Sequence, residues 1–184
     1  FYVPDEKDRI ELRFLCRLFR DSLKPLTALW TTFPHPKYPS LDRLMDKLNS
    51  VHQEDANKAP QIVFVMNGTF HIPVTKNKHY QDRNYVSIGY PIMIIGAGQN
   101  KTFINGGFKI QGMKEEGKRV NMQGMTMKGS NECGLSNDNG LSFLCEQLTF
   151  TQCRYGVWAM NTRGRLINCE VTQCGESGIG CDEN

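Results

Sequence analysis

The sequence predicts a mainly β protein, a right-handed parallel β-helix with a helical N-terminal segment. The motif LTFTQC at residues 148–153 recurs as EVTQC at residues 170–174, and related segments repeat every 21 to 23 residues. Apolar and polar residues alternate inside each copy, which is the pattern of strands with one buried face. Short strands joined by glycine corners at this period are typical of a single-chain solenoid whose coils stack on one another.

The repeat aligns equivalent residues of successive copies. Two interior rows of apolar side chains are expected: Met127, Phe150 and Val171 in one, and Leu135, Val157 and Ile179 in the other. Cys153 and Cys174 are expected to stack as small core residues, since free cysteine behaves as a hydrophobe. Asn137, Asn161 and Asn184, at offsets of 24 and 23, are expected to form a corner ladder of side-chain amides.

The N-terminal part follows a helical period instead. Leu12, Leu15, Phe19 and Leu23 repeat at spacings of three and four, which predicts an amphipathic helix within residues 5–24. Three prolines between residues 34 and 39 indicate an extended connector. We therefore divide the chain into a helical segment with its connector, 1–39, and a β-helix, 40–184.

The β-helix is expected to open with a capping helix. Leu41, Leu44, Met45 and Leu48 repeat at helical spacing, and Ser40 is a suitable N-cap. From residue 60 the pattern changes: IVFVMNGTFHI indicates two short strands, and YVSIGYPIMIIGAGQNKTFINGG continues as strands separated by glycine corners. The last coil ends without a capping pattern, so we expect further coils or a packing partner there.

Charge and cysteine content limit the classes of function. The 22 Lys and Arg residues nearly balance 19 Asp and Glu residues, and no apolar stretch is long enough for a membrane span. Neither nucleic acid nor membrane is therefore an expected partner. Seven cysteines without a C-x-x-C pair argue against zinc and favour reduced thiols, hence a cytoplasmic or nuclear protein. The sequons at Asn67 and Asn100 support secretion as the alternative.

The segment KAPQIVFVMNGTFHI, followed by YPIMIIGAGQNKTFINGG, resembles the opening of pectin-lyase-like right-handed β-helices. In that family an apolar strand ends in a G-T-[FY] corner and a later coil has the pattern I-x-G-x-G-x-x-x-T-x-I. The resemblance covers roughly residues 40–184 and implies the fold. It implies no single activity, because the superfamily contains lyases, hydrolases, esterases and binding proteins. The chain also resembles uncharacterised β-helix proteins of diatoms and oomycetes.

The segment ELRFLCRLFRDSL resembles the closing helix of an F-box, the module that joins a substrate receptor to a ubiquitin ligase. The pattern L-x-C-[RK]-x-[FW]-[RK]-x-L is common in that family, and its central part C-[RK]-x-[FW]-[RK] occurs here at residues 16–20, within LCRLFRDSL at 15–23. The resemblance implies a protein partner, the ligase adaptor subunit, contacted by Leu15, Phe19 and Arg20.

We assign no catalytic residue, metal site or cofactor from the sequence. The calcium-binding aspartates and arginine base of pectate lyases, the G-H-G and R-I-K motifs of polygalacturonases and the Q-D-T-L segment of pectin esterases do not occur. All four histidines precede the repeats, so none is expected on the later coils as an acid or base.

A binding strip is predicted where the copies differ. Trp158 is expected to face outward beside Gly180 of the next coil, as a shelf for a sugar ring or a partner side chain. The polar residues expected around it are Arg154, Asn161, Arg163 and Arg165. Guanidinium groups suit carboxylate or phosphate.

Three hypotheses for function follow. The first is a non-enzymatic recognition protein that binds a protein or anionic ligand on a β-helix face and serves as an F-box-type receptor. The second is a secreted carbohydrate-active lyase or hydrolase of the pectin or polyuronate type, whose catalytic coils lie outside this sequence. The third is a structural subunit of a β-helix assembly.

Overall fold

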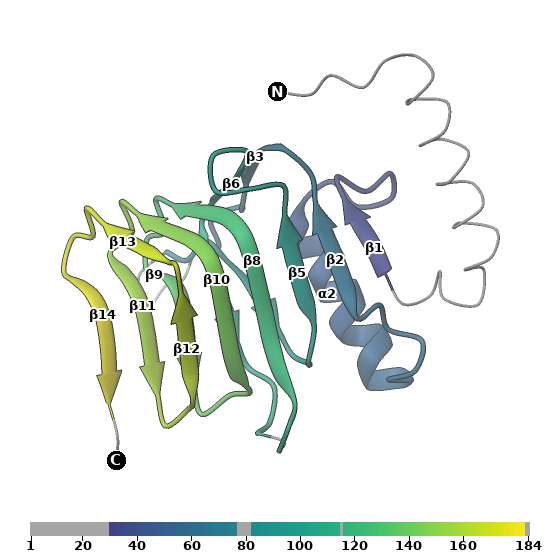
Figure 1. Cartoon of the computed structure of the whole chain (residues 1–184). Helices are drawn as coiled ribbons and strands as arrows, with labels where there is room; N and C mark the ends of the chain where they lie inside the picture. Colours follow the sequence, from purple (N-terminus) through teal and green to yellow (C-terminus); the bar gives the residue numbers. More distant parts are fainter. Residues whose placement is uncertain (1–29, 77–81, 115, 183–184) are drawn as a thin grey trace, which may run out of the picture.

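The computed structural model describes residues 30–76, 82–114 and 116–182, which form one helix and a series of stacked coils (Figure 1). The elements are β1 (Trp30–Phe33), α2 (Leu41–Glu54), β2 (Ile62–Val65), β3 (Gly68–His71), β4 (Tyr85–Ile88), β5 (Met93–Gly96), β6 (Thr102–Asn105), β7 (Gly107–Ile110), β8 (Arg119–Lys128), β9 (Cys133–Asp138), β10 (Ser142–Thr151), β11 (Tyr155–Met160), β12 (Gly164–Ile167), β13 (Glu170–Thr172) and β14 (Ser177–Asp182).

The strands form two parallel sheets. In the nine-stranded sheet the order is β1-β2-β5-β8-β10-β12; β6 pairs with β3 and β8, and β13 pairs with β10. The five-stranded sheet has the order β14-β11-β9-β7-β4. In Figure 1 the nearer, nine-stranded sheet runs upward and the other sheet downward while the chain advances from right to left. This winding is right-handed, so the predicted right-handed parallel β-helix is confirmed.

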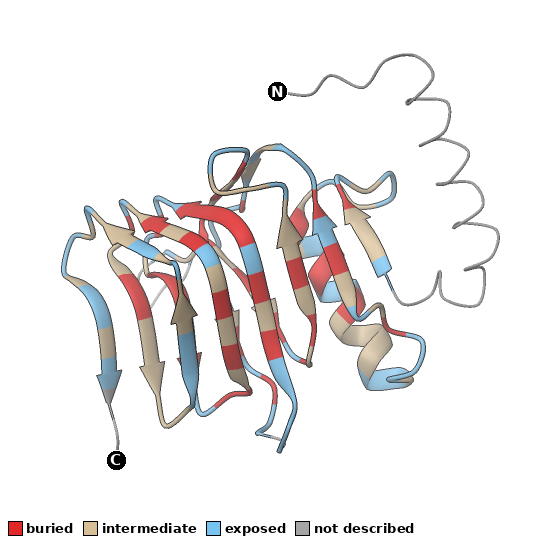
Figure 2. Ribbon diagram, in the orientation of Figure 1, coloured by how far each residue is buried: buried red, intermediate tan, exposed pale blue. Residues whose placement is uncertain are grey.

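Both predicted interior rows are present. Phe150 pairs with Met127 on one side and Val171 on the other, and Val157 pairs with Leu135 and Ile179. Leu135 is 0% exposed, whereas Ile179 is 58% exposed because it lies in the last described coil. Figure 2 shows the same gradient, with buried residues concentrated in the middle coils. The core of the protein is therefore the stack of inward rows between the two sheets.

The coils are not all of one length. Strands β9, β11 and β14 follow one another at the period predicted from the repeat, because Val157 pairs with both Leu135 and Ile179. Earlier coils contain more chain: Ile62 of β2 pairs with Met93 of β5, and Met93 pairs with Asn121 of β8. These coils are longer because more chain lies between β3 and β4 and between β7 and β8. The second of these connections borders the pocket described below.

Helix α2 covers the N-terminal end of the stack, as predicted. Its four apolar positions are all buried: Leu41, Leu44, Met45 and Leu48. Asn49 fixes the helix to the end of β4, because its side-chain amide donates to the Ser87 carbonyl at 3.0 Å and accepts from the Gly89 N–H at 2.9 Å. Ser40 occupies the N-cap position with extended backbone, but its side chain makes no capping hydrogen bond.

The predicted asparagine ladder is wrong in its register. Asn137 pairs with Ala159, not Asn161, and its buried amide donates to the Leu141 carbonyl at 2.6 Å. Asn161 instead follows the strand as Asn139 does one coil earlier, and both have positive φ, 47° and 56°. Asparagine adopts this left-handed region more readily than most residues, so these corners select it. Asn184 lies outside the described residues.

An amide ladder does occur at another corner. Gln152 and Gln173 both have positive φ, 53° and 52°, and the Gln152 side chain donates to the Gln173 carboxamide oxygen at 3.2 Å. The TQC motif therefore has two structural roles. Its glutamine turns the chain and its cysteine fills the core, which explains the repetition without any catalytic role.

Candidate ligand-binding pocket

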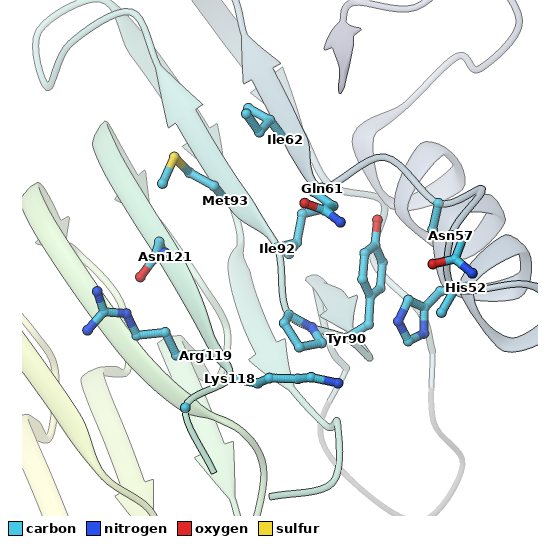
Figure 3. A pocket seen from close by; sticks show the side chains of 14 residues that line it. His52, Asn57, Gln61, Ile62, Tyr90, Ile92, Met93, Lys118, Arg119 and Asn121 are labelled. Carbon is cyan, nitrogen blue, oxygen red and sulfur yellow. The ribbon is translucent and has the colours of Figure 1, made fainter. Parts of the chain in front are cut away.

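A pocket of about 580 Å³ lies at the helix-capped end of the stack (Figure 3). Three parts of the chain form it: the C-terminal half of α2 with the following loop, the segment that leads into β5, and the start of β8. Its lining residues are His52, Ala56, Asn57, Ala59, Gln61, Ile62, Tyr90, Pro91, Ile92, Met93, Gly117, Lys118, Arg119 and Asn121. No residue of this lining carries a carboxylate.

One wall of the pocket is aromatic and rigid. The rings of His52 and Tyr90 are stacked, with centroids 4.4 Å apart and planes 17° from parallel. The Tyr90 hydroxyl donates to the Pro60 carbonyl at 2.7 Å. Burial raises the pKa of Tyr90 well above its usual range. Tyr90 therefore stays protonated, and its fixed ring positions His52.

The rest of the lining is polar and basic. Figure 3 shows Lys118 extending toward the side of Tyr90 and His52, while Arg119 lies on the side of Asn121. The Oδ1 atom of Asn121 is buried and has no hydrogen-bond partner among the described residues. A buried acceptor without a donor costs free energy unless a ligand or water satisfies it. The pocket thus has a cation on each of two sides, and the unsatisfied acceptor lies on the side of Arg119 (Figure 3).

The long coil between β7 and β8 positions these cations. Gly117 has φ 73°, a left-handed conformation that turns the loop, so that Lys118 directly precedes β8 and Arg119 begins it. The loop is held at both ends: Met113 forms an antiparallel bridge with Gly140, and the Ser142 hydroxyl donates to the Lys118 carbonyl at 3.0 Å. Lys118 and Arg119, the last two residues of the run KEEGKR at 114–119, therefore contribute to the pocket.

A second pocket, of about 410 Å³, lies on the other side of Gly117. Its charged lining residues are Lys114, Glu116 and Arg163. Its wall is fixed in part by Thr162, whose hydroxyl donates to the Gly140 carbonyl at 3.2 Å. Arg163, one of the residues predicted from the sequence, therefore belongs to the rim of this loop.

The predicted shelf at Trp158 has the expected register. Trp158 pairs with Gly180 of the next coil and with Ser136 of the preceding one. A Cβ atom at Gly180 would lie 2.3 Å from Trp158 Cε3, so the indole lies directly on this glycine. Tyr155 adds a second ring, 5.5 Å from the indole centroid. Trp158 is half-buried, and the two rings form an aromatic surface on the five-stranded sheet.

Arg154, predicted beside this shelf, forms an ion pair. Its Nε lies 2.6 Å from a carboxylate oxygen of Glu176, and its guanidinium carbon lies 5.2 Å from the Tyr155 ring centroid. The Tyr155 hydroxyl donates to the other oxygen of Glu176. Hydrogen bonds from Tyr155 and then Arg154 lower the pKa of Glu176 below its usual value. Arg154 thus braces two coils, and an anionic ligand would compete with Glu176.

The other predicted residues are distributed over different parts of the surface. Arg165 lies on β12 of the nine-stranded sheet, whereas Trp158 lies on β11 of the five-stranded sheet. Asn161 occupies the left-handed corner after β11. The predicted single strip is therefore divided between two sheets and a connecting corner. Leu15, Phe19 and Arg20, the predicted adaptor contacts, lie outside the described residues.

The described cysteines are free thiols: Cys133, Cys145, Cys153, Cys169, Cys174 and Cys181. Burial raises the pKa of Cys133 to about 12 and that of Cys145 beyond its usual range, so these thiols stay protonated. In the part of the chain that the structure describes, no group of three or more His, Cys, Asp or Glu side chains could hold a metal ion. Within that same part, no helix has the length and apolarity to cross a membrane.

Comparison with known proteins gives one structural similarity. No family model matches the sequence, and no curated protein matches it. Among solved structures, the chain is similar to the A-module of the mannuronan C-5 epimerase AlgE4 from Azotobacter vinelandii, with a TM-score of 0.48 and 12% identity. The match covers 76% of this chain and 46% of that module, so the chain spans less than half of it. The similarity concerns the coiled architecture alone.

Proposed function

We propose that this protein is a recognition module that binds an anionic ligand in the pocket between α2 and β8. The observation that carries the proposal is the composition of the lining: Lys118 lies on the side of the stacked His52 ring, Arg119 lies on the side of Asn121, and no carboxylate lines the pocket (Figure 3). Guanidinium and ammonium groups bind carboxylate or phosphate by charge-assisted hydrogen bonds. Asn121 adds an acceptor for a hydroxyl or amide donor of the same ligand.

Binding without catalysis fits this lining better than hydrolysis does. Glycoside hydrolysis in most families needs two carboxyl groups on either side of the bond that is cleaved, and the described lining supplies none. Tyr90 is held protonated by burial. The residues can position and neutralise an anion, but they do not form the acid–base pair of a retaining or inverting enzyme.

Calorimetry with three probes tests the proposal: trigalacturonate, inorganic phosphate and the neutral sugar maltotriose. We expect an anionic probe to bind and maltotriose not to bind. Loss of a hydrogen bond to a charged group costs about 1.5–3 kcal/mol, so Arg119→Ala should weaken binding by about tenfold or more. Arg165→Ala is the matched control, because Arg165 is exposed on the same sheet and does not line the pocket. No binding of either anion, or equal losses in both variants, would refute the proposal.

A carbohydrate-active enzyme remains the alternative function. It would use the pocket as a subsite and take its catalytic groups from coils outside this sequence. Release of reducing or unsaturated sugars from polygalacturonate by a longer chain that contains those coils, but not by the 184 residues alone, would support this alternative over simple recognition. A purely structural role would instead give a protein that assembles and binds none of the probes.

The aromatic surface at Trp158 is a second candidate contact, for a sugar ring or a partner protein. It lies on the five-stranded sheet and pairs two rings at 5.5 Å. Trp158→Ala should reduce capture of such a partner and leave anion binding in the pocket unchanged. The adaptor contact through Leu15, Phe19 and Arg20 stays a prediction from sequence, tested by pull-down with the ubiquitin-ligase adaptor subunit and by its loss in Phe19→Ala.

A further inference from the structure

An apolar surface covers the outer face of the nine-stranded sheet at its N-terminal edge. Its residues, here called the β1 patch, are Trp30, Ile62, Phe64, Met93 and Ile95. Trp30 is 39% exposed and Phe64 is 37% exposed, and their rings meet edge to face with centroids 6.0 Å apart. The alternate residues of the same strands point inward and are fully buried, for example Val63 and Ile94. The patch residues therefore face outward.

The register makes the patch continuous and sets its limit. Trp30, Ile62 and Met93 are successive partners in one outward row, and this row becomes polar at Asn121 on β8. The neighbouring row runs from Thr32 on β1 through Phe64 and Ile95 and becomes polar at Gln123. The outer face is thus apolar over β2 and β5 and at Trp30 of β1, and polar at β8. Contiguous exposed apolar surface of this kind marks a contact site.

We propose that residues 5–24 of this same chain occupy the β1 patch. These residues lie outside the described ones. Leu12, Leu15, Phe19 and Leu23 repeat at helical spacing, and such a segment is marginally stable alone in water and needs an apolar surface. A helix that places these side chains on the patch would cover both apolar faces at once.

Chain connectivity favours this occupant over a separate protein. The segment joins the described structure at Trp30, which is itself part of the patch. The connection from residue 25 to 29 can span about 3.3–3.6 Å per residue, enough for the segment to reverse over Phe64. A short linker holds its partner at an effective concentration in the millimolar range. The segment is therefore presented to the patch at higher concentration than any dissolved partner.

In this arrangement the apolar side chains of residues 5–24 cover the β1 patch and do not serve as an F-box contact. Leu15 and Phe19 would be covered by the chain's own sheet and would be withdrawn from an adaptor subunit. The proposal is independent of the pocket's function, although Ile62 and Met93 border both surfaces. Loss of anion binding in the pocket would leave the docking on the β1 patch intact. Loss of the docking would likewise leave anion binding through Arg119 intact, so the two proposals can fail separately.

Cross-linking through the native Cys16 tests the docking in the full chain. Phe64→Cys places a thiol in the centre of the patch, and oxidation with copper phenanthroline followed by peptide mass spectrometry measures an intramolecular disulfide to Cys16. The control is Lys109→Cys, on the five-stranded sheet away from the patch. Given the effective concentration of a tethered segment, we expect the yield at position 64 to exceed the control by about tenfold. Leu15→Asp in the Phe64→Cys protein should reduce it to the control level.

Tryptophan fluorescence provides an independent readout without a new thiol. The sequence has two tryptophans, so Trp158→Phe leaves Trp30 as the only reporter. Phe19→Asp should shift the Trp30 emission to longer wavelength and increase acrylamide quenching. Equal cross-linking yields at both positions together with unchanged Trp30 emission would overturn the proposal. A link found only between two chains, or emission that changes with protein concentration, would overturn it in favour of a second copy.

Discussion

Stability of one interior row gives a quantitative test of the coil register. Leu135 and Ile179 belong to the same row, two coils apart, and substitution by Ala removes three carbons from each. Leu135 is 0% exposed, and a buried Leu→Ala change costs about 2–5 kcal/mol. Ile179 is 58% exposed, so less than half of its side chain is buried. Each buried carbon contributes about 0.8 kcal/mol to stability, so removal of three carbons from Ile179 should cost about 1 kcal/mol in all.

Urea unfolding of the whole chain measures both free energies. The midpoint should fall clearly further for Leu135→Ala than for Ile179→Ala, with the slope unchanged in both. Hydrophobicity of the sequence positions alone would predict similar losses for the two changes. Equal losses, or a larger loss for Ile179→Ala, would refute the register and the burial gradient derived from it.

Three further predictions concern the last coils. Glu176→Gln should destabilise the protein at neutral pH, with the difference vanishing as the pH falls through the lowered pKa of Glu176, whose ordinary value is 4.5; pH-dependent unfolding measures it. Gly180→Ala should displace the Trp158 indole and lower the thermal midpoint, because the added Cβ would lie 2.3 Å from it. Cys181, which is exposed, should react with iodoacetamide much faster than Cys133, whose pKa is raised to about 12, when peptides are quantified by mass spectrometry.

The coils could be predicted because their side chains repeat with a fixed period. Phe150 and Val157 each have an equivalent in the coil before and the coil after, and a row in a solenoid needs only this local spacing. The asparagine corner could not be placed to the residue, because corners are defined by φ and not by hydropathy. Asn139 and Asn161 share positive φ, while Asn137 is buried, lacks the positive φ and accepts a hydrogen bond from the Gly140 N–H.

The pocket could not be predicted from the repeat. Its residues come from a helix, a strand start and a long loop, and their proximity depends on how much chain lies between β7 and β8. His52 precedes the repeats, so it is not expected on the later coils. Helix α2 caps the stack, however, and this position brings the His52 ring into contact with Tyr90. The signal available in the sequence is the KEEGKR run, which interrupts the repeat with paired cations.

Mapping an anionic probe by NMR tests the central claim most directly. Trigalacturonate added to ¹⁵N-labelled protein should shift amide signals of Gln61, Gly117, Arg119 and Asn121, which line the pocket, and leave the Trp158 indole N–H unchanged. The shifts should diminish in Arg119→Ala and with added salt, because an ion contact at the surface is screened. Shifts confined to Trp158 and its neighbours, or no shifts at all, would contradict anion recognition in this pocket.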